Sequence, residues 1–224
     1  MLSAPPDIER PEPRWPVIIA VLAAVGLHFA LPDSLRFGPS WLVAGSVLVL
    51  IAAAHVTRNT GHHQWNSRVA YAILGILTGA LLFGVAQLVS GVLDRSIGAP
   101  ILLRSACILW LTNVIVFASW YWRLDAGGPN ARERADFHDE GAFLFPQMTF
   151  TVGDDPQKSL AEEQGWRPNF VDYLFVSFNT STAFSPTDAP VLTRWAKSAM
   201  MIQALISFTT VVLIAARAVN ILPS

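Results

Sequence analysis

The chain has little charge for its length. Only 14% of its 224 residues are Asp, Glu, Lys or Arg, whereas a soluble domain carries about 25%. Hydrophobic residues make up 53% of the chain, and the formal net charge of -1 gives no basic excess for binding nucleic acid. The low charge therefore predicts an integral membrane protein that has the lipid bilayer as its surroundings.

Cysteine and catalytic motifs are also scarce. Cys107 is the single cysteine, so it cannot form an intrachain disulfide. The chain contains no G-x-S-x-G, H-E-x-x-H or phosphate-binding G-x-x-x-x-G-K-S/T sequence. The acidic stretch from Asp136 to Glu140 has no standard zinc or calcium spacing, so a solvated surface explains it best. We therefore expect no enzyme, no cofactor and no metal site.

Five apolar blocks predict five transmembrane helices in an all-α integral membrane protein. A spanning helix needs about 20 apolar residues, within a range of roughly 17 to 25. The last three blocks meet this length, and the first two need flanking residues to reach it. The blocks cover residues 15–31, 41–56, 69–93, 101–122 and 196–222.

These blocks divide the chain into four regions. Residues 1–14 are a proline-rich tail of mixed charge that we expect to be flexible, and residues 15–122 form a four-helix transmembrane region. Residues 123–168 form a long polar connecting loop. Residues 169–224 hold a re-entrant helix, a loop and the final transmembrane helix.

The third block carries Gly75 and Gly79, which are four residues apart and share one helix face. Small residues at this spacing let two helix backbones approach closely. We expect them to pack against another helix of the same protomer, with packing between subunits as the alternative.

Residues 169–183 predict a short helix with one apolar side. Asn169 is a suitable N-cap, and Asp172 puts negative charge in the first turn. Pro186 ends the helix near Ala183. A helix of about 12 residues cannot cross about 30 Å of hydrocarbon, so it enters partway and directs its C-terminal dipole at a cation. The apolar side carries Phe170, Tyr173, Leu174 and Phe178.

This segment resembles the pore helix, filter and inner helix of potassium channels. Those channels typically read S-x-x-T-x-T-T-V-G-Y-G-D, and residues 177–188 read S-F-N-T-S-T-A-F-S-P-T-D. The resemblance implies a homo-oligomeric, ion-channel-like protein whose permeating partner is a monovalent cation. The chain is also similar to bacterial multi-span membrane proteins that carry the sequence T-A-F-S-P-T-D, which implies a bacterial plasma membrane and no particular activity. The positions that match the potassium-channel pattern are Ser177, Thr180, Thr182, Asp188 and Thr193.

The filter itself departs from the channel pattern, because both of its glycines are replaced. In the channel family those glycines allow the backbone to turn its carbonyls toward the ion. We therefore expect a cation pathway without the usual potassium selectivity. Asp188 either attracts cations at the mouth or accepts hydrogen bonds from its own chain. The expected pathway comprises Asn179, Thr180, Thr182, Ala183, Phe184, Ser185, Pro186, Thr187 and Asp188.

A stripe of small or polar residues follows on the last apolar block. Its spacing of i, i+4, i+8 and i+11 puts these residues on one helix face. Under the channel interpretation the stripe lines the axis of the oligomer. Under the alternative it packs against the fourth helix, and the protein is a non-conducting structural or partner-binding membrane protein that retains a pore-loop fold. The stripe comprises Ala199, Gln203, Ser207 and Thr210.

Two arguments give opposite orientations in the membrane. The channel resemblance puts the long loop and the short helix outside. Most Arg and Lys residues fall on that same side, whereas cytoplasmic loops carry the excess of these residues. We follow the charge bias, which places the N-terminus and the long loop inside.

Overall fold

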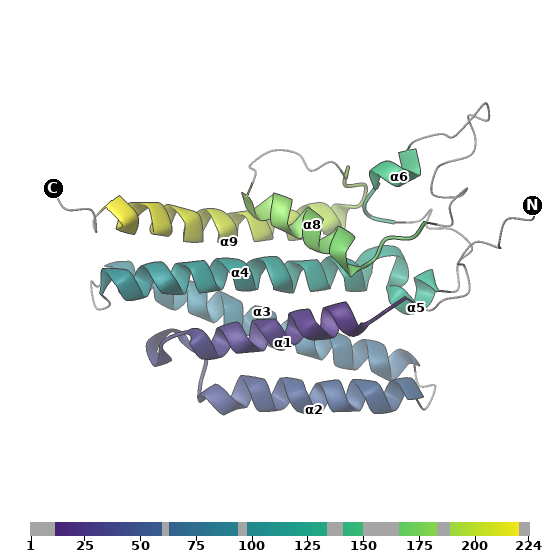
Figure 1. Cartoon of the computed structure of the whole chain (residues 1–224), viewed down its shortest axis with the longest axis horizontal. Helices are drawn as coiled ribbons and strands as arrows, with labels where there is room; N and C mark the ends of the chain where they lie inside the picture. Colours follow the sequence, from purple (N-terminus) through teal and green to yellow (C-terminus); the bar gives the residue numbers. More distant parts are fainter. Residues whose placement is uncertain are drawn as a thin grey trace, which may run out of the picture.

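The computed structural model describes residues 12–59, 63–93, 98–133, 141–149, 166–182 and 189–219. These residues form α-helices, two short 3-10 helices and an isolated antiparallel bridge between Phe143 and Val191. The prediction of an all-α fold is confirmed (Figure 1).

The helices follow the predicted apolar blocks closely. The five long ones are α1 (Trp15–Ala30), α2 (Ser40–Asn59), α3 (His63–Leu93), α4 (Ala99–Leu124) and α9 (Arg194–Val219). A helix of 13 residues, α8 (Phe170–Thr182), precedes α9. The remaining short elements are η1 (Asp33–Leu35), η2 (Asp125–Gly127), α5 (Pro129–Arg132) and α6 (Pro146–Thr149).

Three of the described helices are long and apolar enough to cross a membrane. They are α3, α4 and α9, over Gln64–Val92, Ala99–Gly127 and Arg194–Ala216, with mean hydropathies of 2.0 to 2.2. The two other apolar helices, α1 and the Trp41–Ala54 part of α2, are shorter. Length and composition therefore support three of the five expected spans directly.

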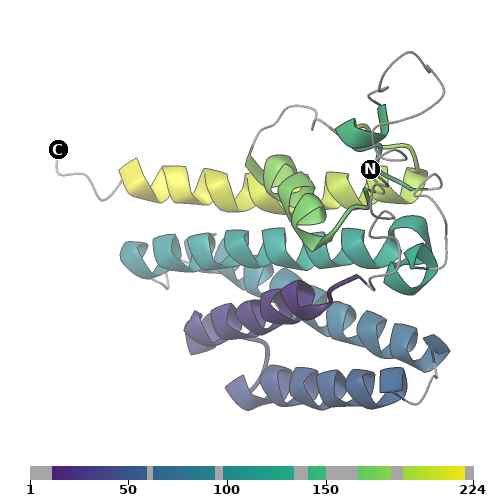
Figure 2. The same ribbon diagram turned by 45° about the vertical axis from the view of Figure 1, so that its right-hand side comes forward.

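Helix α4 lies at the centre of the bundle. Helices α8 and α9 pack on one side of it, α1 and α3 pack on the other, and α2 packs against α3 (Figure 1). The turned view shows α8 lying across the layer formed by α4 and α9 (Figure 2). The apolar window of α4 is 61% buried, whereas that of α9 is only 22% buried. Helix α9 therefore leaves most of its apolar surface for lipid or another chain.

A tight turn after α4 explains the Gly-Gly-Pro sequence at residues 127–129. The φ angles of Gly127 and Gly128 are 74° and 87°, in the left-handed region that glycine adopts readily. A Cβ atom on Gly128 would lie 2.6 Å from the carbonyl oxygen of Arg123. The turn reverses the chain and brings α5 back against the end of α4.

Part of the expected polar loop belongs to the core. Phe143 is fully buried, and its ring packs edge-on against the rings of Tyr173 and Trp195. The backbone beside it pairs with the segment just before α9, where Leu192 N donates to Ala142 O at 2.8 Å. The apolar residues of this segment bury themselves against α8, so the segment is anchored rather than solvated.

The expectation that Gly75 and Gly79 pack within the protomer is wrong. A Cβ atom on either residue would meet nothing within 4 Å. The close approach lies at Gly84, where a Cβ atom would be 2.8 Å from Leu109 Cδ2 and 3.3 Å from Leu35 O. Helix α3 therefore meets α4 and η1 one turn beyond the predicted pair.

We expect Gly84→Val to lower the thermal stability of the protein in detergent, because the added carbons collide with Leu109 and with the backbone at Leu35. Overpacking of this kind costs about 1–3 kcal/mol. Gly79→Val is the matched control, since it adds the same side chain on the same helix where the structure leaves space. Equal melting temperatures for the two variants would contradict this packing.

Candidate functional site

Gln203 is the centre of a buried polar network that joins three helices. Its side chain has no exposed surface. The amide nitrogen of Gln203 donates to Ser177 Oγ at 2.8 Å and to Ser181 Oγ at 2.7 Å, both on α8. Its amide oxygen accepts from the hydroxyl of Tyr121, on α4, at 2.5 Å. A single side chain from α9 therefore ties α8 to α4.

Three further hydrogen bonds extend this network. Asn113, on α4, donates through Nδ2 to Ser207 Oγ at 2.8 Å and to the carbonyl of Gln203 at 3.1 Å. Ser177 Oγ donates to the carbonyl of Val114 at 2.7 Å. The network thus links each pair of the three helices, and all its polar side chains are buried.

The network accounts for the stripe expected to line a pore. Gln203, Ser207 and Thr210 are buried inside the protomer, and Ala199 is half-buried against the same core. Thr210 donates to its own helix, at the carbonyl of Ser207. The stripe therefore faces α4 and α8, as the packing alternative requires, and does not face outward from the protomer.

The beginning of α8 has the predicted cap. Asn169 Oδ1 accepts from the backbone of Val171 at 2.8 Å, and Asp172 Oδ2 accepts from the backbone of Asn169 at 2.7 Å. These reciprocal bonds satisfy donors that a helix start leaves free. The predicted apolar side is only partly correct, because Phe178 is 46% exposed whereas Ser177 and Ser181 are buried.

At the C-terminal end of α8, one terminal carbonyl bonds to another helix of the same protomer. A helix leaves its last four carbonyls without helical partners. Here Ser181 O accepts from the indole nitrogen of Trp110, on α4, at 3.3 Å. The hydroxyl of Thr182 donates to Phe178 O at 2.9 Å, and that of Thr180 to Val176 O at 2.8 Å. These hydroxyls bond to their own helix, and Asn179 beside them is half-buried.

The rest of the expected ion pathway lies outside the described residues. Those positions are Ala183, Phe184, Ser185, Pro186, Thr187 and Asp188. The chain is described again from Ala189, which is buried.

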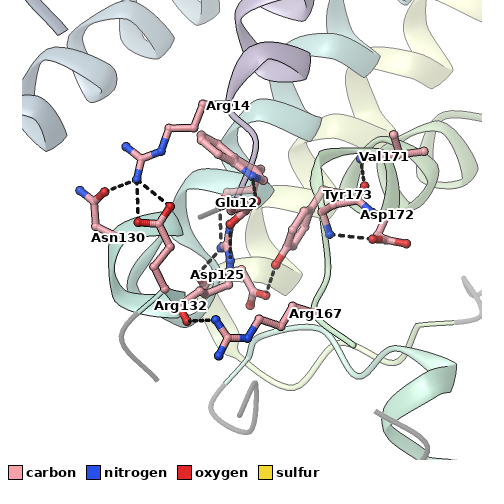
Figure 3. Close-up of polar contacts among 12 residues, drawn as sticks. Glu12, Arg14, Asp125, Asn130, Arg132, Arg167, Val171, Asp172 and Tyr173 are labelled. Atoms are coloured by element: carbon pink, nitrogen blue, oxygen red, sulfur yellow. Dashed lines mark hydrogen bonds and ion pairs between the residues drawn. The ribbon is translucent and has the colours of Figure 1, made fainter. Parts of the chain in front are cut away.

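A second polar cluster lies where α8 begins, at the end of α4 (Figure 3). Arg132 is 4% exposed, and its Nη1 donates to the carbonyls of Trp122 and Asp125, each at 2.9 Å. Its Nη2 forms an ion pair of 3.0 Å with Glu12 Oε2. The sequence places Glu12 in a flexible tail, whereas the structure holds it against α4 and α5 because a buried guanidinium needs a counter-charge.

Asp125 connects this cluster to α8. The hydroxyl of Tyr173 donates to Asp125 Oδ2 at 2.6 Å (Figure 3). The backbone N–H of Ala142 donates to Asp125 Oδ1. Burial raises the pKa of the Tyr173 phenol well above its ordinary value, so the phenol stays protonated and acts as the donor. The Arg132 guanidinium lies 5.3 Å from the centre of the Tyr173 ring.

No sequence motif marks this cluster. Its members come from the N-terminal tail, the end of α4, α5 and α8, so no single segment shows a motif. One local feature of the sequence indicates it. At the end of the fourth apolar block, a Gly-Gly-Pro turn lies between an acidic residue, Asp125, and a basic one, Arg132. A polar pair at that position needs partners if the turn folds back on the bundle.

The comparisons with known proteins add no assignment to this geometry. No protein-family model, no curated protein and no solved structure matches the chain. We therefore infer function from the two polar clusters and from the helices that carry them.

We expect Gln203→Leu to destabilise the protein in detergent by about 1–3 kcal/mol, because it leaves the hydroxyls of Tyr121, Ser177 and Ser181 without their partner. Thr209→Val is the control, since the Thr209 hydroxyl bonds only to its own helix, at Leu205 O. A melting temperature of Gln203→Leu equal to that of the control would show that the network contributes no stability.

Proposed function

We propose that the chain is a non-conducting integral membrane protein, structural or partner-binding, that uses a pore-loop-like unit as part of its own bundle. In this proposal α1, α2, α3, α4 and α9 span the bilayer. Helix α8 is re-entrant, since its 13 residues reach only about 20 Å at 1.5 Å per residue. Helix α1, with 16 residues, would need local thinning of the bilayer or flanking residues to span it.

The observation that carries the proposal is the burial of Gln203 between α4 and α8 of its own protomer. A pore-lining side chain must reach water on the axis of a ring, and Gln203 is fully enclosed. Its amide already has partners on two neighbouring helices. Turning it toward an axis would break those bonds at membrane depth, where unsatisfied polar groups are costly.

The charge distribution supports an orientation for the same bundle. Arg14, Arg132 and Arg167 lie at the end of the bundle where α1 begins and α4 ends (Figure 3). Arg123 lies in the last turn of α4, at the same end. Cytoplasmic ends of membrane proteins carry the excess of Arg and Lys. We therefore place this end, with the N-terminal tail and the connecting loop, in the cytoplasm. In this orientation α8 enters the bilayer from inside.

The second candidate is the cation channel implied by the potassium-channel resemblance. One observation favours it: Thr182, a member of the expected pathway, is exposed at the C-terminal end of α8. The negative end of the helix dipole at this point would attract a cation. A conducting form would need a ring of several copies, because one such helix cannot enclose an axis.

A flux assay on the full chain in liposomes separates the two candidates. We expect no potassium or thallium uptake above that of empty liposomes, because the polar stripe of α9 is occupied within the protomer. Addition of a potassium ionophore to the same vesicles shows that they are sealed and that the dye responds.

Uptake that rises with the amount of protein and falls in Asp188→Asn would overturn the scaffold proposal. That variant removes a carboxylate at the mouth of the expected pathway without changing the size of the side chain. Thr209→Val, which alters a hydroxyl outside the network, is the matched control for reconstitution.

A further inference from the structure

A pocket lies among α1, α2, α3 and α4, near the end of the bundle where α4 stops. Its volume is about 180 Å³. That exceeds the roughly 150 Å³ of an engineered apolar cavity that takes up benzene. Apolar side chains form most of its walls, including those of Val17, Ile51 and Ile73. Ile18, on the outer side of α1, lines the pocket and is 43% exposed, so the wall reaches the surface of the bundle.

Arg123 lines this apolar pocket and is only 4% exposed. Its Nε has no hydrogen-bond partner, and no carboxylate of the described residues acts on it. The contact that the structure gives its guanidinium is the ring of Tyr71, with 5.5 Å from Cζ to the ring centre. A guanidinium remains charged in any protein environment, so the pocket contains a buried positive charge that has no counter-charge among the described residues.

The two neighbouring arginines, unlike Arg123, have carboxylate partners. Arg132 is paired with Glu12, and Arg14 with Glu133 at 3.2 Å. Both guanidiniums repel that of Arg123, which increases the cost of leaving it unpaired. Arg14 also lines the pocket, and its Nε is a second donor without a partner. Within the described part of the chain, the pocket therefore offers two N–H donors and one positive charge without partners, beside apolar walls.

We propose that this pocket binds an acidic lipid, with the anionic group on the Arg123 guanidinium and one aliphatic chain along the walls formed by α1, α2 and α3. The anion supplies the missing counter-charge, and the chain covers the apolar walls. A small inorganic anion would satisfy Arg123 but would leave those walls without a partner. A zwitterionic lipid would bring a cationic group toward Arg14 and Arg123. Basic pockets between membrane helices on the cytoplasmic side bind acidic head groups in this way.

The site does not depend on whether the protein conducts ions, because the pocket and the Gln203 network lie on opposite sides of α4. The lipid-binding experiment can therefore fail while the scaffold proposal stands, and flux can be found while the lipid site stands. The two proposals have separate readouts.

The test titrates the full chain in a mild non-ionic detergent with oleoyl lysophosphatidic acid and counts bound lipid by native mass spectrometry. We expect one lipid per chain at saturation. Lysophosphatidylcholine with the same chain should bind about tenfold or more weakly, as for loss of a charge-assisted hydrogen bond. Inorganic phosphate at millimolar concentration should not displace the lipid.

Three variants locate the site. Arg123→Gln should weaken lysophosphatidic acid binding about tenfold or more, because it removes the charge. Ala70→Phe, which adds bulk on the α3 wall of the pocket, should weaken binding while keeping Arg123. Arg68→Gln removes the same charge from an exposed residue of α3 outside the pocket, so its binding should equal that of the natural chain.

Several outcomes would overturn the proposal. Equal occupancy by the acidic and zwitterionic lipids would remove the role of charge. Displacement by inorganic phosphate would make this a free-anion site. Unchanged binding in both Arg123→Gln and Ala70→Phe would place the lipid elsewhere on the protein. If one of these variants does not fold, the other still decides the question, since each alters a different part of the pocket.

Discussion

The side-chain amide of Gln203 constrains the rest of this structure, because a primary amide buried in an apolar bundle must find partners inside it. It donates to two serines of α8 and accepts from a tyrosine of α4. Those partners are buried as well, and Ser177 also donates to the carbonyl of Val114 on α4. This arrangement fixes the position of α8. Among the described side chains, only Gln203 donates to the hydroxyls of Ser177 and Ser181, and the same amide accepts from Tyr121 of α4.

Hydrogen bonds between polar groups also hold the two ends of α8 against the α4 side of the bundle. At the N-terminal end of α8, the hydroxyl of Tyr173 donates to Asp125, which lies in the turn after α4. At the end, the indole of Trp110 donates to the Ser181 carbonyl. A helix that is tied along its whole length to one neighbour is suited to a scaffold. Arg123, which has no carboxylate partner among the described residues, lies on the other side of α4, where it lines the pocket.

The sequence was sufficient for the helices and insufficient for their contacts. Block lengths predict the long helices, and Asn169 with Asp172 predicts the cap of α8, because these signals are local. The buried face of α8 was missed at Ser177 and Ser181, since apolar periodicity selects Phe178 and cannot see that Gln203 arrives from a distant segment. Phe143 was assigned to a polar loop for a similar reason: its burial depends on α8 and α9. Most of the expected ion pathway, residues 183–188, lies outside the described residues.

The central claim is that α8 docks on α9 of its own chain. Ser181→Cys combined with Gln203→Cys, in a chain whose exposed Cys107 is replaced by Ala, places two thiols where the natural side chains touch at 2.7 Å. After treatment of membranes with a short bifunctional thiol reagent, we expect the chain to run as a cross-linked monomer in a denaturing gel. Cross-linked dimers or larger species as the main product would show that α8 packs against a neighbouring copy, and would contradict the account.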